Sequence, residues 1–415
     1  MNQANWPLDG ASQRIADIRT AELTVALTDT QGRPLPGRSV QVQQQRHAFW
    51  FGCNGYLLLS DEDARFQRVY EEQLAGLFNV VTLPFYWSAY EAAAGLTAQR
   101  RLQSMARWCA ERGIVAKGHP LLWTHPAGSP PWLPDHPDEV RAQWAARITE
   151  LVGEFAGLID CWDLFCEPTD AFRFDTALAR QIQRDGLLPS LRQAFALARE
   201  ANPNAQLLVT DYRVDSAAVD AFGALVDEAG APLYDAAGLL THQLSRLLTP
   251  DELWTLCERF APLGRPLHST STVILSGRRL TTGPLGFADG GEPQFGPTNP
   301  GDEAAQAAAV EAYYTTLFSH PAVEAIAWWD LSDRGAWLQA PAGLLRADGS
   351  PKPAYETLWR LIRHDWWTDT TVTTDADGQA SLRVFAGDHR VTCDAAQATV
   401  HAARGGAAAV VLRLD

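Results

Sequence analysis

Four side chains suited to acid–base or nucleophilic chemistry stand at or just after short apolar runs of this chain: Glu167, Cys166, Ser271 and His242. A carboxyl group such as that of Glu167 can give or take a proton during a reaction. A serine hydroxyl such as that of Ser271 attacks only when a base removes its proton, and a histidine such as His242 can act as a base. Cys166 has two interpretations, a buried small side chain or a thiol that reacts or binds a metal. We therefore predict a catalytic site that contains these four residues.

Aromatic and polar side chains after other apolar runs predict where a substrate would bind. Exposed aromatic rings form platforms on which ligand rings stack, although tryptophans also pack in protein cores. Histidines in such places either contact a ligand or are hydrogen-bonded within the core. The predicted substrate-binding residues are His119, Trp123, Asp211, Tyr212, Trp329, Asp330 and Trp337.

Eight apolar runs, each bounded by polar or Gly/Pro residues, alternate with helical stretches. The runs are 49–53, 78–83, 115–121, 159–164, 206–211, 236–241, 266–273 and 325–331. In the first helical stretch, 61–77, apolar residues recur at the spacing of one helix face, and Ser60 is placed to cap it. Eight strand–helix units fit a (β/α)8 TIM barrel better than an open doubly wound sheet, which would normally have a Gly-rich turn after its first strand.

The barrel positions the chemistry, because active sites of this fold lie at the C-terminal ends of the strands. The candidates named above stand at those ends, together with Asp163, Ser269 and Asp333. We therefore expect all of them to converge on one mouth.

The two ends of the chain have a different pattern from the middle. Segments 21–27 and 38–43 alternate apolar and polar residues, and so do 380–386, 389–393 and 408–414. We predict a small accessory β-sandwich built from both ends, with two separate β-modules as the alternative. The expected organisation is N-terminal sandwich strands at 12–48, the barrel at 49–365 and C-terminal sandwich strands at 366–415.

Three segments carry a resemblance to a known family. Residues 161–167 resemble the W-D-x-x-N-E acid/base motif of family 10 glycoside hydrolases, the retaining endo-1,4-β-xylanases, and 117–123 resemble their G-H-x-x-x-W motif. Residues 329–355 are similar to the closing segment of the family. The resemblance covers roughly 47–365 and implies a pair of carboxylates about 5–5.5 Å apart, an acid/base and a nucleophile. Glu167 matches the acid/base.

The chain departs from the family pattern at the nucleophile and at several sugar contacts. Where the family has I-T-E or F-T-E, this chain has Ser269-Thr270-Ser271, so a serine replaces the nucleophilic glutamate. Cys166 replaces the asparagine before the acid/base, and Leu240 replaces a glutamine. Thr124 stands where a histidine often follows the tryptophan, and the second strand ends in L-P-F-Y-W without the family's E-N and lysine.

Three functions remain open from these departures. The first is a repurposed enzyme that uses Glu167 as general acid/base on a non-xylan small-molecule or glycoside-like substrate. The second is a catalytically inactive protein that binds a carbohydrate or other ligand. The third is a retaining xylanase whose nucleophile was changed by engineering, which would explain Ser271 but not Cys166, Leu240 or Ser269.

Composition limits the partners. The net charge of −15 argues against nucleic acid and anionic membranes, and no apolar window is long enough to span a bilayer. We expect a small-molecule or oligosaccharide ligand and leave the oligomeric state open. Residues 1–6 lack the features of a secretory signal, so we expect a cytoplasmic protein, or a secreted one if a signal had been removed.

No cofactor is expected. The six cysteines form no CxxC pair and predict neither a zinc knuckle nor a disulfide framework. His119, His242, His268, Cys166 and Glu167 would suit zinc, iron or copper if the fold gathered them. Their spacing is not local, so no metal ligand is predicted.

Overall fold

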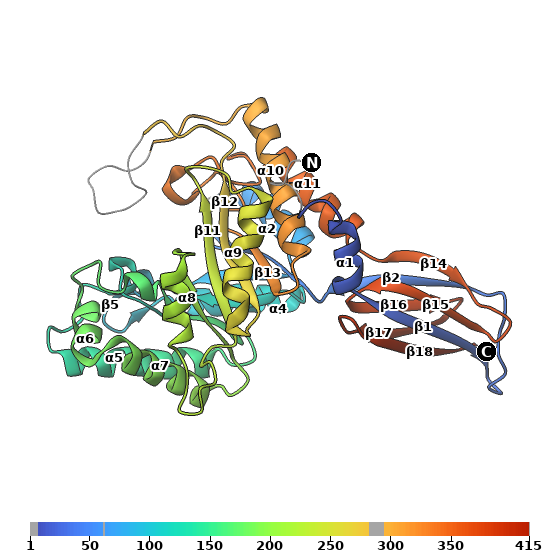
Figure 1. Ribbon diagram of the computed structural model, residues 1–415, viewed down its shortest axis with the longest axis horizontal. Coiled ribbons are helices and arrows are strands. Elements are labelled where there is room, and N and C mark those ends of the chain that lie inside the picture. Colours follow the sequence, from blue (N-terminus) through green and yellow to red (C-terminus); the bar gives the residue numbers. More distant parts are fainter. Residues whose placement is uncertain (1–6, 61–62, 282–293, 415) are drawn as a thin grey trace.

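The centre of the computed structural model, which describes residues 7–60, 63–281 and 294–414, is a closed barrel of parallel strands (Figure 1). Its eight strands, among the described residues, are β3 (Trp50–Asn54), β4 (Val80–Pro84), β7 (Val115–His119), β9 (Cys161–Cys166), β10 (Gln206–Asp211), β11 (Ala236–Gln243), β12 (Leu267–Ile274) and β13 (Val323–Trp328). Each pairs with the next, and β13 pairs with β3 to close the ring. The TIM-barrel prediction is confirmed.

Helices cover the outside of the barrel and bury their apolar faces against the strands. They are α2 (Ala64–Leu77), α4 (Gln99–Glu111), α5 (Pro137–Glu154), α6 (Ala177–Asp185), α7 (Leu187–Ala201), α8 (Ser216–Gly223), α9 (Pro250–Phe260), α10 (Pro300–Phe318) and α11 (Pro353–Arg360). Shorter elements in the loops are α3 (Trp87–Tyr90), β5 (Glu91–Ala93), β6 (Leu96–Thr97) and β8 (Leu122–Trp123). β8 pairs in parallel with the end of β9, so Trp123 lies beside Cys166.

The first helix begins later than the sequence predicts. The prediction that Ser60 caps this helix is wrong, because the carboxylate of Asp63 accepts hydrogen bonds from the backbone N–H groups of Arg65 and Phe66. An aspartate at this position satisfies two N–H groups that the helix itself leaves without partners. Residues 61–62 of the predicted helix, and residues 1–6, lie outside the described residues.

The two ends of the chain form one β-sandwich beside the barrel, with α1 (Ala11–Arg19) at the junction (Figure 1). One sheet contains β1 (Thr20–Asp29), β15 (Gln379–Phe385) and β18 (Ala407–Leu414), and the other contains β2 (Ser39–His47), β14 (Asp369–Thr373), β16 (Gly387–Cys393) and β17 (Ala396–Ala402). Each sheet mixes strands from both ends, and one apolar cluster joins the sheets. The single sandwich is therefore confirmed over two separate modules, while the predicted domain boundaries stay a prediction.

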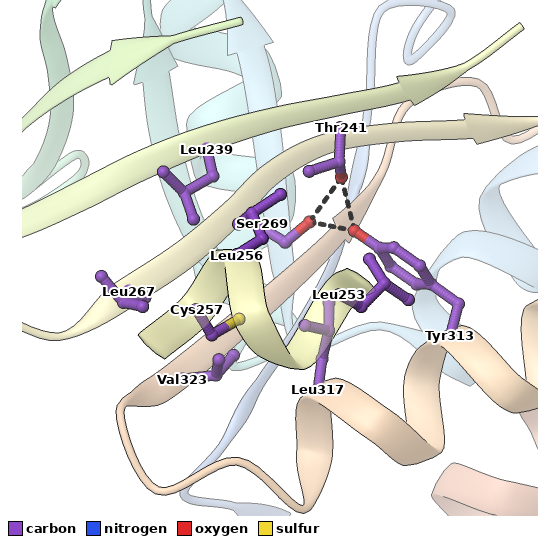
Figure 2. A pocket seen from close by; sticks show the side chains of 10 residues that line it. All are labelled: Leu239, Thr241, Leu253, Leu256, Cys257, Leu267, Ser269, Tyr313, Leu317 and Val323. Carbon is purple, nitrogen blue, oxygen red and sulfur yellow. Dashed lines mark hydrogen bonds between the residues drawn. The ribbon is translucent and has the colours of Figure 1, made fainter. Parts of the chain in front are cut away.

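A β-bulge in β12 decides which of its serines reaches the barrel mouth. In the pairing with β11, Ser269 lies opposite Leu239 and Ser271 opposite Leu240, so Thr270 is an extra residue. A bulge of this kind re-aims the side chains on either side of it. The hydroxyl of Ser269 consequently lies 2.7 Å from the phenol oxygen of Tyr313 on α10, in the wall between strands and helices (Figure 2). The prediction that Ser269 converges on the mouth is wrong for this reason.

Candidate active site

Glu167 stands directly after β9 in a strained backbone conformation. Its φ of 61° lies in the left-handed region, which a residue with a side chain adopts at a cost, and its N–H donates to the carbonyl of Thr210 at 2.7 Å. Strain of this type concentrates at functional sites, where the surrounding structure holds the residue in place. The side-chain carboxyl accepts a hydrogen bond of 2.9 Å from the indole N–H of Trp123.

Burial sets the protonation of Glu167. It raises the pKa of the carboxyl to about 7, against the opposing effect of the Trp123 hydrogen bond and with a further contribution from the charge of Asp211. A large fraction of Glu167 is therefore protonated near neutral pH and able to donate a proton. Catalytic acids need a raised pKa of this kind.

Ser271, which is predicted to replace the nucleophile, faces His242. Its hydroxyl lies 3.2 Å from Nε2 of His242. Burial, with a smaller contribution from His119, lowers the pKa of His242 to about 4, so the ring is neutral at pH 7. Its other nitrogen, Nδ1, is buried without a hydrogen-bond partner among residues 7–60, 63–281 and 294–414. The pair has the contact of a serine and its base but lacks a third group to orient the base and stabilise its charge.

A buried ion pair holds His119 in the barrel. Asp163 is fully buried, and its Oδ2 lies 2.8 Å from Nζ of Lys117 and 2.7 Å from Nδ1 of His119. Burial alone would raise the pKa of Asp163, but Lys117 and His119 lower it to about 2. The charged carboxylate therefore fixes the orientation of the His119 ring.

Aromatic rings connect the ends of the strands around the mouth. The ring of Trp329 lies 5.5 Å from that of His119 and 6.1 Å from that of His242, and Trp337 lies 4.8 Å from His242, all between centroids. The predicted residues His119, His242, Trp329 and Trp337 are thus brought together. Edge-to-face and tilted contacts of this kind are favourable between aromatic rings.

Two tyrosines belong to the same group and were not among the predicted site residues. The ring of Tyr86 lies 5.5 Å from His119 and 5.9 Å from Trp123, and its phenol oxygen accepts a hydrogen bond of 3.3 Å from Tyr56. Tyr56 in turn packs edge-on against Trp329. Tyr86 follows the second barrel strand, and that position was the signal that could have identified it.

Three predicted substrate-binding residues take positions that hold loops in place. Asp330 accepts hydrogen bonds from the backbone N–H of Trp337 at 3.0 Å and from the amide of Asn54 at 3.3 Å, and burial raises its pKa to about 7. Asp211 accepts from the N–H and the hydroxyl of Thr169, which follows Glu167 by two residues. Tyr212 is 39% exposed and donates to Asp170 at 3.0 Å, on the rim beside Glu167.

Cys166 lies inside the wall of the site. Its side chain is buried, and burial, followed by the charge of Glu167, raises the pKa of the thiol well above its usual value. A thiol that stays protonated is neither a nucleophile nor a metal ligand, which favours the interpretation of Cys166 as a packed small side chain.

Asp333 is not part of this mouth, and the described residues form no metal cluster there. Asp333, expected there, binds Lys352 and the backbone N–H of Gly343 instead. His268 lies deeper on β12, beside Trp50. Over the described ranges, no group of three or more His, Cys, Asp or Glu side chains is arranged to hold a metal ion. None of the described helices has the length and apolarity needed to cross a membrane.

Curated relatives match this chain at low identity. The anti-sigma-I factor RsgI6 of Acetivibrio thermocellus is 24% identical over 390 residues, which is 93% of this chain and 46% of that protein. Endo-1,4-beta-xylanase 5 of Arabidopsis thaliana is 22% identical over 216 residues, 51% of this chain and 35% of that protein. An endo-1,4-beta-xylanase of Geobacillus stearothermophilus is 25% identical, over 59% of this chain and 76% of that protein. The chain thus spans less than half the length of the first two.

Solved structures share the barrel. Xylanase 10B from Thermotoga petrophila, determined in complex with xylobiose, superposes with a TM-score of 0.62 at 20% identity, over 77% of this chain and 95% of that one. An endoxylanase from a sugarcane soil metagenome gives a TM-score of 0.64 at 19% identity, over 76% and 97%. The model of glycosyl hydrolase family 10 matches residues 57–361, which contain every site residue predicted from the sequence but not Tyr56. This chain belongs to glycosyl hydrolase family 10.

Proposed function

We propose that this chain is a repurposed member of the family, in which Glu167 acts as general acid/base on a glycoside-like or other small-molecule substrate that is not xylan. The observation that carries the proposal is the state of Glu167, whose buried carboxyl is held by Trp123 and has a pKa raised to about 7. Burial of a carboxyl costs folding free energy, and a carboxyl with a raised pKa at the end of a barrel strand is a candidate for catalysis.

The conventional reaction of the family does not fit position 271. Double displacement needs a carboxylate about 5–5.5 Å from the acid/base to form a glycosyl–enzyme intermediate. Ser271 offers a hydroxyl whose neighbour, His242, has a pKa lowered to about 4 by burial and is a weak base. We therefore expect proton transfer by Glu167 without a covalent intermediate at Ser271.

The changed contacts support a substrate other than xylan. Cys166 is buried and Leu240 is 8% exposed. Neither side chain has the amide that the family pattern has at these positions. A site that has replaced such amides with apolar groups binds polar sugar hydroxyls poorly, because their hydrogen bonds to water are not replaced. The aromatic rings of Tyr86, Trp329 and Trp337 favour a ligand with apolar faces.

A ligand-binding protein without turnover is the second candidate. Two observations favour it: Nδ1 of His242 has no partner within the part of the chain that the structure describes, and a relative matched over 93% of this chain is named an anti-sigma-I factor. The raised pKa of Glu167 favours the enzyme instead.

The first test asks whether the mouth still accepts a xylose-based sugar. The wild-type chain and the Ser271→Glu variant are assayed on an aryl β-xylobioside, each with and without azide as a substitute nucleophile. We expect no turnover in any of the four reactions. Turnover restored by the glutamate or by azide would mean that only the nucleophile is missing, as in an engineered xylanase, and would contradict a non-xylan substrate.

The second test asks whether Glu167 does chemistry. Wild type, Glu167→Gln and the control Glu150→Gln, which lies on the exposed face of α5, are screened on aryl glycosides of other sugars. Product formation that is lost in Glu167→Gln and kept in Glu150→Gln supports the proposal. If ligands bind but none is turned over, the ligand-binding alternative replaces it.

A further inference from the structure

A cavity of about 260 Å³ lies at the opposite end of the barrel from Glu167, where the β-sandwich meets the barrel floor. Its barrel side comes from the starts of strands, including Trp50 of β3 and Glu324 of β13. Its sandwich side includes Arg19, at the end of α1, and Arg404, in the turn between β17 and β18. The volume is slightly below that of sites for drug-sized ligands, which is about 300–1,000 Å³.

His268 lines this cavity and has no hydrogen-bond partner in it. The side chain is 3% exposed, and the structure gives its ring no hydrogen bond within residues 7–60, 63–281 and 294–414. Its one ring contact is with Trp50, at 5.5 Å between centroids. Buried polar groups in proteins are nearly always hydrogen-bonded. The ring of His268 keeps a small exposure to the cavity, so it is open to a polar group of a ligand that enters there.

The charges around the cavity favour an anion. Arg19 donates from Nε to the carbonyl of Phe318 and from Nη2 to those of His320 and Val323, which leaves Nη1 without a protein acceptor among the described residues. Burial, and then the charge of Arg404, lower the pKa of Arg19 to about 9, so it is cationic at neutral pH.

Arg404 adds a second guanidinium at the rim of the cavity. It lies 3.5 Å from Glu324, and its Nη2 donates to the carbonyl of Pro321 at 2.7 Å. Its pair with Glu324 is long and partly exposed, with 35% and 49% of the two side chains accessible. Two guanidinium groups thus face one carboxylate, and guanidinium groups bind carboxylates with paired hydrogen bonds.

We propose that this cavity is a second binding site, which takes a small organic carboxylate with a ring-shaped body. The carboxylate would lie between Arg19 and Arg404, and the ring would pack against Trp50 with His268 beside it. The walls on this side are apolar through Trp50 and Phe49. The site shares β12 with Ser271 but no residue with the mouth, so the proposal does not depend on the function of Glu167.

Benzoate and its neutral analogue benzamide test the site, because they have nearly the same shape and differ in charge. Calorimetric titrations are made on the full chain, on Arg404→Gln and on the control Arg383→Gln, whose exposed pair with Glu22 lies elsewhere on the sandwich. We expect saturable benzoate binding that weakens at least tenfold in Arg404→Gln and is unchanged in Arg383→Gln. Benzamide is expected to bind at least tenfold more weakly than benzoate.

The partly exposed position of Arg404 makes its variant a fair test, because a glutamine there leaves the core untouched. Absence of saturable benzoate binding to the wild-type chain would overturn the proposal. Benzamide binding as tight as benzoate binding would also overturn it. Benzoate binding that is not weakened in Arg404→Gln would overturn it too. Crystals soaked with benzoate should show its carboxylate between the two arginines, and density elsewhere would also contradict the assignment.

Discussion

At the level of single residues, the mouth of the barrel is asymmetric. On one side, Glu167 has a raised pKa and a hydrogen-bond donor, Trp123, beside its carboxyl. On the other, the hydroxyl of Ser271 lies beside the neutral His242, at the position where we propose that the nucleophilic carboxylate of the family is replaced. Without a carboxylate at position 271, the site can transfer a proton but cannot form a glycosyl ester there, and this difference separates the proposed chemistry from that of the xylanases.

The burial of Glu167 has a cost in stability that pH should reveal. The pKa of a glutamate in the unfolded chain is about 4.3, whereas that of folded Glu167 is raised to about 7. The folded chain therefore loses stability as pH rises from the first value through the second. The Glu167→Gln variant has no carboxyl to titrate at this position, so it does not lose this stability as pH rises. We expect the variant to be more stable than wild type by about 3–4 kcal/mol at pH 8, with the difference closing toward pH 4.

Denaturant unfolding of both chains at the two pH values measures this effect. Glu150→Gln is the matched control, because that side chain is exposed, and it should give the same difference at both pH values. A stability gap for Glu167→Gln that does not grow between pH 4 and pH 8 would contradict the raised pKa.

The ion pair under His119 should be essential for folding stability. Asp163→Asn leaves the charge of Lys117 buried without a partner, and we expect a loss of about 3–5 kcal/mol in the free energy of unfolding. Lys117→Met combined with Asp163→Asn should recover part of that loss, because the unpaired charge is gone. Asp394→Asn, at an exposed ion pair with Arg38, should change little. If Asp163→Asn alone were as stable as wild type, Lys117 would have another partner for its charge.

The site could be predicted from the sequence only in part, and single residues show why. Motif order identified Glu167, His119, His242 and the aromatic residues, because strand ends of a barrel meet at one face. Ser269 was misplaced, since the bulge at Thr270 turns it outward and a bulge leaves no mark in an apolar run. Tyr86 was missed because its role comes from ring contacts with other strands.

At the level of elements, β7 and β9 pack so closely that a glycine is required between them. A Cβ on Gly118 would lie 2.1 Å from Cε3 of Trp162, whose ring is fully buried against Phe85. We expect Gly118→Ala to lower the free energy of unfolding by about 3 kcal/mol or more, because neither the strand nor the ring can move away.

Gly153 in α5 provides the contrast. The nearest atom to a Cβ there is the carbonyl oxygen of Ala201, at 4.0 Å. Gly153→Ala should therefore be neutral or stabilising by up to about 1 kcal/mol, since alanine favours helix. Thermal unfolding of the two variants compares them directly. Equal effects would mean that β7 is less tightly packed against Trp162 than the structure indicates.

The predicted strands illustrate which elements a sequence reveals. The eight barrel strands are largely buried on both faces, and most of them contain short apolar runs, which are easily recognised. β14 and β17 were not predicted. The first is exposed at nearly every position, and the second consists largely of small and half-exposed residues, so neither has an apolar run. These two strands form through hydrogen bonds to a neighbouring strand, β14 with β2 and β17 with β16.

At the level of the whole molecule, hydrogen bonds of Arg19 connect the sandwich to the barrel. Its buried guanidinium donates three hydrogen bonds, each of 2.7 Å, to carbonyls of the segment 318–323 between α10 and β13. Removal of the side chain leaves these buried acceptors without partners. We expect Arg19→Ala to lower the free energy of unfolding by about 3 kcal/mol, whereas Arg383→Ala at an exposed pair costs less than about 1 kcal/mol.

Loss of these hydrogen bonds should also change how the molecule unfolds. The barrel and the sandwich have separate apolar clusters, so each can unfold by itself once the junction is weakened. Calorimetry of Arg19→Ala should then resolve two transitions. One unshifted transition would mean that other contacts at the junction couple the two parts.

The most direct test of the account is the pKa of Glu167 itself. Carbon-13 labelling of glutamate side-chain carboxyls allows each to be titrated by NMR, and the resonance that disappears in Glu167→Gln identifies the one of interest. A midpoint near pH 7 is the predicted result, and it would establish a protonated acid in the mouth at neutral pH. A midpoint near that of a free glutamate, about 4.3, would contradict the proposed general acid and favour a barrel that only binds its ligand.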